Sequence, residues 1–122
     1  MKWAIDIDGV ITANPAAFSF LTYHLNKNEN SDTVIILTWR DGSDPERRKQ
    51  TMEELDIFGI YYNQVIMAPK KFDNIRAAAL WKISKMKELG INIWIDDEIK
   101  MYIRDLGIDV HALLPDVHCI WI

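Results

Sequence analysis

Near its N-terminus the chain reads Trp3-Ala4-Ile5-Asp6-Ile7-Asp8-Gly9, an apolar run that ends in two aspartates and a glycine. A run this short and this apolar predicts a buried strand, and Asp8-Gly9 predicts the turn that ends it. Further along, short apolar runs alternate with longer segments of helical period. That alternation is typical of an α/β domain, so we expect a mostly parallel sheet of five or six strands between two layers of helices.

Apolar runs predict four further strands, over residues 34–38, 64–67, 91–95 and 110–114. Helical periods and capping residues predict helices that begin at Pro15, at Pro45 and after an Asp73 cap, and a fourth over residues 98–106. Residues 26–32 predict a polar turn. The tail 117–122 also has strand composition, and both a sixth, edge strand and a dimer contact remain open for it.

Length and charge narrow the class of protein. The chain has 122 residues, so we expect residues 1–122 to form one domain. Its net charge of -4 argues against a protein whose whole surface clamps nucleic acid. The single cysteine, Cys119, excludes an intramolecular disulfide and any CxxC metal or redox motif. No apolar run reaches the ~20 residues of a membrane span. Asp6 also interrupts the apolar stretch that a signal peptide would need near the N-terminus, so we expect a cytoplasmic protein without membrane contact.

Polar residues that carry chemistry follow three of the predicted strands, namely Asp6 and Asp8, then Thr38, then Asp96-Asp97. In open α/β sheets the carboxyl ends of the strands form the functional edge. Two like charges ~4 Å apart repel by about 4 kcal/mol at an effective dielectric near 20, so four carboxylates at one edge require protons or a cation. Capping of the next turn would explain any one of these aspartates but not all four. A hard divalent ion with oxygen ligands, most simply Mg²⁺, resolves the repulsion.

These segments resemble three motifs of the haloacid dehalogenase superfamily, and the resemblance covers nearly the whole chain. Asp6-Ile7-Asp8-Gly9-Val10 is similar to its first motif, Ile35-Ile36-Leu37-Thr38 to its second, and Ile93-Trp94-Ile95-Asp96-Asp97 to its fourth. The resemblance implies a Rossmann-like three-layer core and a Mg²⁺-dependent phosphatase that works through an aspartyl-phosphate. An acid two residues after the nucleophile is, in this family, a mark of hydrolases.

The resemblance also implies roles for individual residues. Asp6 would be the nucleophile, and Asp8 the general acid for the leaving oxygen and then the base that activates water. Thr38 would hydrogen-bond a phosphoryl oxygen. Asp6, the Asp8 carbonyl, and Asp96 or Asp97 would bind Mg²⁺. A carboxylate nucleophile suits the chemistry independently, because it divides one difficult displacement into two easier ones.

The third motif of the family requires a cation near the start of the helix that precedes the fourth motif. Lys70, Lys71 and Arg76 are the candidates, with Lys71 slightly favoured because a flexible amine just before the helix reaches the sheet edge easily. Arg76 follows closely. Lys82 lies at least one turn further into the helix, and we expect it on the surface.

Neither gap between the motifs has room for a cap domain, so we expect an open site. Water exclusion must then come from a large substrate or from a neighbouring subunit of a homo-oligomer. Trp39 and Arg40, just after Thr38, are the candidate substrate contacts, with Trp39 as a platform for a base.

A narrower likeness links Thr38-Trp39 and Trp94-Ile95-Asp96-Asp97-Glu98 to RNA-repair-linked domains and polynucleotide kinase-type 3′-phosphatases. It raises a nucleic-acid end as substrate, which the net charge does not support. Two alternatives to the phosphatase stay open: a nucleotidase or phosphotransferase acting on small phosphorylated metabolites, and a non-catalytic phospho-ligand-binding domain.

Overall fold

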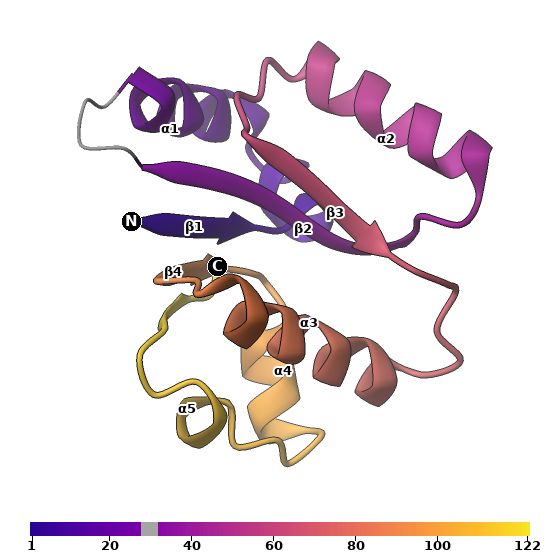
Figure 1. Cartoon of the computed structure of the whole chain (residues 1–122), viewed down its shortest axis with the longest axis vertical. Coiled ribbons are helices and arrows are strands. Elements are labelled where there is room, and N and C mark those ends of the chain that lie inside the picture. The colour runs from indigo at the N-terminus through magenta and orange to yellow at the C-terminus, as the bar shows by residue number, and fades with distance from the viewer. Residues whose placement is uncertain (28–31) are drawn as a thin grey trace.

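The computed structural model describes residues 1–27 and 32–122. Its sheet has five strands, all parallel, in the order β3-β2-β1-β4-β5 (Figure 1). The strands are β1 (Lys2–Ile5), β2 (Thr33–Asp41), β3 (Gln64–Ala68), β4 (Ile93–Ile95) and β5 (His118–Ile120). Thus β1 lies at the centre, between β2 and β4, and its carboxyl end is the middle of the functional edge.

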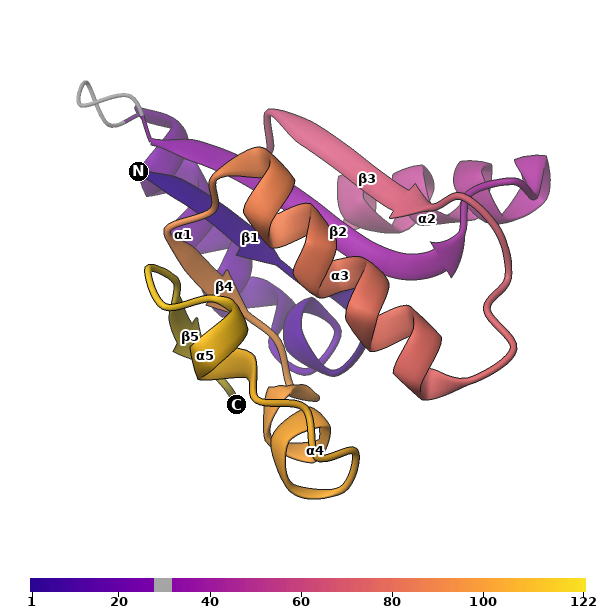
Figure 2. The same cartoon turned by 60° about the horizontal axis from the view of Figure 1, so that its bottom comes forward.

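Helices cover both faces of this sheet (Figures 1 and 2). One face carries α1 (Pro15–Lys27) and α2 (Pro45–Ile57), and the other carries α3 (Ile75–Leu89), α4 (Ile99–Arg104) and α5 (Val110–Leu113). Alternate residues of β2 enter the two cores, Ile36 on the α1–α2 side and Leu37 on the α3–α5 side. The predicted three-layer α/β sandwich is confirmed, and within the described residues no segment forms a cap domain.

Two of the predicted helix starts are confirmed by their caps. Asn14 Oδ1 accepts from the Ala17 N–H at 3.2 Å, and Asp44 Oδ1 accepts from the Glu46 N–H at 3.0 Å. The third start is displaced by one residue, because Asn74 rather than Asp73 caps α3 by accepting from the Ala77 N–H at 2.8 Å. Local hydrogen bonding therefore places each helix relative to the strand end before it.

The strand predicted over residues 110–114 was wrong. Residues 110–114, expected as a strand, contain helix α5, which Asp109 caps by accepting from the Ala112 N–H at 3.1 Å. The i, i+4 spacing of Val110 and Leu114 suits one helix face, and both side chains are buried.

The tail provides the fifth strand instead. The His118 N–H donates to Asn92 O at 2.8 Å, so β5 adds to the free side of β4 as an edge strand. The sheet therefore has five strands, and the tail is the edge strand that the sequence left open. The polar turn predicted over 26–32 falls largely outside the described residues. No helix in the described ranges is both long and apolar enough to cross a bilayer.

Candidate functional site

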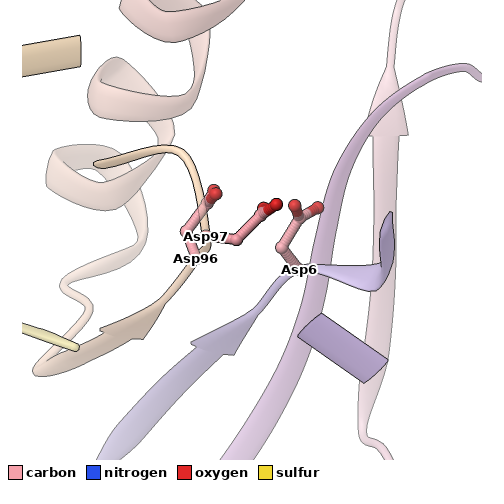
Figure 3. Close-up of side chains that lie close together, drawn as sticks. All are labelled: Asp6, Asp96 and Asp97. Carbon is pink, nitrogen blue, oxygen red and sulfur yellow. The ribbon is translucent and has the colours of Figure 1, made fainter. Parts of the chain in front are cut away.

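Three carboxylates meet where β1 and β4 end side by side. Asp6 follows β1, and Asp96 and Asp97 follow β4, with the Asp6 N–H donating to Ile95 O at 3.0 Å. One carboxylate oxygen from each aspartate lies within 4.8 Å of the others, and the three side chains converge (Figure 3). We call Asp6, Asp96 and Asp97 the acidic cluster. The structure thus brings together three of the four aspartates that the sequence placed at this edge.

The cation of the acidic cluster is Lys82, which the sequence analysis placed on the surface. Its side chain is fully buried, and its Nζ lies 2.8 Å from Asp96 Oδ2 and 3.4 Å from Asp6 Oδ1. The expectation was wrong because it counted turns from the helix start and ignored the helical face. Lys82 stands three or four residues from Ala78, Ala79 and Met86, all of them buried, so the apolar period of α3 already pointed it inward.

The two cations favoured from the sequence lie elsewhere. Arg76 donates from its guanidinium to Leu106 O, which ties the start of α3 to the loop after α4. Lys71 is exposed and lines a neighbouring cavity. Among the described residues, Lys82 is the cation in ion-pair contact with the acidic cluster.

Burial and mutual repulsion change the acid–base behaviour of the cluster. Burial, reinforced by Asp96, raises the pKa of Asp6 to about 8 even though Lys82 opposes the shift. Burial and Asp96 also raise the pKa of Asp97. Burial by itself would lower the pKa of Lys82, but Asp6 and Asp96 outweigh it and raise that pKa. The cluster therefore favours uptake of a positive charge, either a proton or a metal ion.

The hydrogen bonds show which oxygens are available to such an ion. Each oxygen of Asp96 already accepts one hydrogen bond, Oδ2 from Lys82 and Oδ1 from the Glu98 N–H at 2.9 Å, and each keeps a second lone pair. Among the described residues, the buried atoms Asp6 Oδ1 and Asp97 Oδ1 have no hydrogen-bond partner, although Lys82 Nζ forms an ion pair with Asp6 Oδ1 at 3.4 Å. Unpartnered buried carboxylate oxygens are costly unless a cation meets them. The donor set consists of hard carboxylate oxygens, so the cluster fits a metal ion that prefers oxygen ligands.

A wide turn after β1 shapes the other side of the site. In this turn, η1 (Ile7–Ile11), the Thr12 N–H donates to Ile7 O at 3.1 Å, and Gly9 has a φ of 78°. A side chain at Gly9 would begin 2.0 Å from Asp97 Oδ2. Glycine is therefore required here for two reasons, its left-handed backbone and the close approach of Asp97.

Asp8 projects from the same turn but is not part of the acidic cluster. Its carboxylate pairs with Arg40, from Nε to Oδ2 at 2.9 Å and from Nη2 to Oδ1 at 2.6 Å. Arg40 also donates from Nη1 to Glu54 Oε2 at 2.7 Å and to Thr51 Oγ1 at 3.2 Å. We call Asp8, Arg40 and Glu54 the Arg40 bridge. Hydrogen bonds from Arg40 hold the pKa of Asp8 below its usual value.

The Arg40 bridge uses the guanidinium group that the sequence analysis predicted to contact a substrate. The guanidinium is nearly buried, and its donors are already committed to Asp8, Glu54 and Thr51. The structure therefore assigns Arg40 an internal contact, with Asp8 as its most exposed partner.

Thr38 and Trp39 lie at the end of β2. Thr38 is buried, and its Oγ1 accepts from the Arg40 N–H at 3.2 Å, which leaves its own hydroxyl proton for another acceptor. Trp39 is half-buried and lines a cavity of about 510 Å³ beside the site. The other lining residues are Asp8, Arg40, Asp41, Arg47, Lys71, Phe72, Asp73, Asn74, Ile75 and Glu98.

Comparison with known proteins shows an α/β fold shared with a component of a repair assembly. No protein-family model matches the chain, and no curated protein matches it significantly. A chain in the structure of the Pnkp1/Rnl/Hen1 RNA repair complex is similar to it, with a TM-score of 0.66 and 16% sequence identity. The match covers 99% of this chain and 42% of that chain, so this chain spans less than half of the longer one. At this identity the likeness establishes the fold.

Proposed function

We propose that this chain is a Mg²⁺-dependent phosphatase that hydrolyses phosphomonoesters through an aspartyl-phosphate on Asp6. The observation that carries the proposal is the acidic cluster with its buried cation: Asp6 Oδ1 lies beside Asp97, is 3.4 Å from Lys82 Nζ and has no hydrogen bond among the described residues. The resemblance of the strand-end motifs to haloacid dehalogenase phosphatases supports the same reading, as does the fold shared with an RNA-repair component.

In the first step, an oxygen of Asp6 attacks phosphorus, so that an Asp6 O–P bond forms as the P–O bond to the leaving group breaks. Asp6, Asp96 and Asp97 would hold the Mg²⁺, which when bound offsets the charge of the phosphoryl group and keeps Asp6 ionised. The Lys82 ammonium, with its Nζ 3.4 Å from Asp6 Oδ1, contributes positive charge next to the attacking carboxylate. Thr38, with its free hydroxyl proton, donates to a phosphoryl oxygen.

In the second step, Asp8 accepts a proton from the water that attacks the aspartyl-phosphate, and Asp6 is released. The Arg40 bridge keeps Asp8 ionised, which suits a general base. The same bridge opposes proton donation by Asp8 in the first step. An alkoxide leaving group still requires this proton, so the first step proceeds through the fraction of the protein in which Asp8 is protonated and donates to the leaving oxygen.

The experiment is turnover of p-nitrophenyl phosphate with Mg²⁺ and with chelator, in the wild type and in Asp6→Asn. We expect activity that requires Mg²⁺ and falls by at least about 10³-fold in Asp6→Asn, because an amide is a poor nucleophile. Asp56→Asn, which changes an exposed aspartate on α2, is the matched control and should be neutral. Activity of Asp6→Asn within tenfold of the wild type would exclude the nucleophile.

A phosphorylated protein detected by mass spectrometry in Asp8→Asn would support the two-step route. The rival functions predict other results. A phosphotransferase would need an acceptor other than water, and a non-catalytic domain would bind phosphate without turnover in any variant.

A further inference from the structure

The cavity beside the acidic cluster is placed to hold the part of a substrate that is not transferred. Asp8 and Glu98 line this cavity on the side of the cluster. The Glu98 backbone N–H donates a hydrogen bond to Asp96 Oδ1. Its volume of about 510 Å³ lies within the range of small-molecule sites, roughly 300–1,000 Å³. A phosphoryl group at Asp6 therefore leaves its ester group facing this cavity.

Two aromatic rings line the cavity from different parts of the chain. Trp39 comes from β2, one residue after Thr38, and Phe72 comes from the loop between β3 and α3. Phe72 is itself held in place: its ring centroid lies 5.8 Å from that of Trp81, and the Lys70 Nζ lies 5.9 Å from it. Aromatic rings at such a site offer stacking surfaces for a flat heterocycle.

The charges around the cavity argue against a long polyanion. Arg47 and Lys71 are the lining cations outside the Arg40 bridge, and among the described residues neither forms an ion pair. Asp41, Asp73 and Glu98 also line the cavity, so the acids outside the bridge outnumber these two cations. A track for several phosphodiesters would need a surplus of positive charge. The lining instead suits one uncharged aromatic unit next to one phosphate.

We propose that the substrate is a nucleoside phosphate, free or at the end of a single strand, whose base stacks in this cavity while its phosphoryl group reaches Asp6. The inference rests on the proposed phosphatase function and adds the substrate class. Sugar phosphates have no flat ring for Trp39 or Phe72. At a duplex end the terminal base is held in a base pair, so it cannot enter the cavity as a single base.

The test compares substrates that differ by the base alone. We measure kcat/KM for adenosine 5′-monophosphate and for ribose 5-phosphate, in the wild type and in Trp39→Ala. Base stacking contributes about 1–3 kcal/mol, which corresponds to a preference of about 5- to 150-fold for the nucleotide. We expect that preference in the wild type and its loss in Trp39→Ala, in which the two substrates should have similar kcat/KM. Phe20→Ala, which removes an exposed ring outside the cavity, is the control.

Further measurements identify the source of the nucleotide and distinguish the absence of a base site from the absence of turnover or from a destabilised variant. A single-stranded oligonucleotide with a terminal phosphate, compared with the same end in a duplex and with free adenosine 3′- and 5′-monophosphates, shows which source is used. Binding of adenosine monophosphate to Asp6→Asn, with and without Trp39→Leu, is measured by calorimetry and needs no turnover. Trp39→Leu also replaces Trp39→Ala should the smaller residue destabilise the fold.

The outcomes distinguish this inference from the proposed function. Equal kcat/KM for the nucleotide and ribose 5-phosphate in the wild type would overturn the base site while leaving the phosphatase in place. Binding that depends on Trp39, without turnover of any phosphate, would support the base site and refute the phosphatase. Turnover of the nucleotide unaffected by both Trp39→Leu and Phe72→Leu would overturn the assignment of the cavity.

Discussion

The acidic cluster and the Arg40 bridge stand at the same sheet edge and balance their charges in opposite ways. In the cluster, three carboxylates face the single ammonium of Lys82, and two buried oxygens have no hydrogen-bond partner among the described residues. In the bridge, Arg40 meets its carboxylates at 2.6–2.9 Å, and both carboxylates are partly exposed to water. The charged groups of the bridge are hydrogen-bonded to one another, whereas, within the described ranges, those of the cluster leave two oxygens without a hydrogen bond.

This difference is the reason for proposing that the chemistry takes place at the acidic cluster and not at the Arg40 bridge. When all its groups are ionised, the cluster has an excess of two negative charges, which matches the charge of one divalent ion. The bridge has its donors committed and offers no comparable site. Chemistry is therefore expected where charge is buried and unbalanced, while the bridge fixes the position and ionisation of Asp8.

The sharpest way to break the comparison is to remove the buried cation. Lys82→Met should abolish activity and lower the free energy of unfolding by about 3–5 kcal/mol in chelator, because loss of one partner leaves buried charge uncompensated. Lys71→Met, the change at the cation favoured from the sequence, should leave stability nearly unchanged. Urea denaturation of both variants, beside their kcat/KM, makes the measurement. Equal effects of the two substitutions would show that Lys82 is not the cation of the site.

The strand-end aspartates were predictable because two local signals agree. A short apolar run ends at Asp6 and another at Asp96, and parallel strands put such ends at one edge. Burial of Lys82 was also within reach, since its spacing from Ala78 and Met86 is that of one helix face. Counting the helical period would have found it.

Other features depend on contacts that no local pattern carries. Arg40 and Asp8 are 32 residues apart, and only the pairing of β1 with β2 brings them together. The C-terminal error has another cause: over residues 110–122 two short apolar stretches lie close together, and either could form the strand. Asp109 as a cap decides for the helix, but a four-residue helix shows too little periodicity to be recognised.

The second prediction uses pH to show that the cluster accepts a cation. In the metal-free protein the pKa of Asp6 is raised to about 8, so the native state holds a proton that the unfolded chain loses near pH 4. This group's contribution to stability therefore falls as pH rises from about 4 to 8. Mg²⁺ competes with that proton, so the stabilisation it gives should grow from pH 6 to pH 8.

Thermal melts with Mg²⁺ and with chelator at three pH values measure this effect. At 100 times its dissociation constant the ion adds about 2.7 kcal/mol, and Asp97→Asn should reduce the gain because it alters an unpartnered oxygen. Asp41→Asn, outside the cluster, is the control. Absence of any Mg²⁺-dependent shift in the wild type at pH 8 would contradict the metal site.

A third prediction sharpens the role of the bridge. Arg40→Lys keeps a positive charge but loses the two parallel hydrogen bonds to Asp8. We expect kcat to fall by about 10- to 100-fold with KM little changed, because Asp8 loses its position rather than the substrate losing a contact. Steady-state kinetics measure kcat and KM separately. A large rise in KM at unchanged kcat would instead support Arg40 as the substrate contact that the sequence predicted.

The smallest effect is expected at Arg76, the other cation that the sequence placed near the site. Its guanidinium donates to Leu106 O on the surface, so Arg76→Ala should remove one exposed hydrogen bond and cost less than about 1 kcal/mol. Activity should stay within twofold of the wild type, since Lys82 remains in contact with Asp6 and Asp96. Denaturation and kcat/KM are measured beside Lys85→Ala, which removes an exposed i, i+3 pair with Glu88 on the same helix. A loss of activity at Arg76 comparable to that of Lys82→Met, with stability intact, would mean that the substrate recruits Arg76 from outside and that the site has two cations.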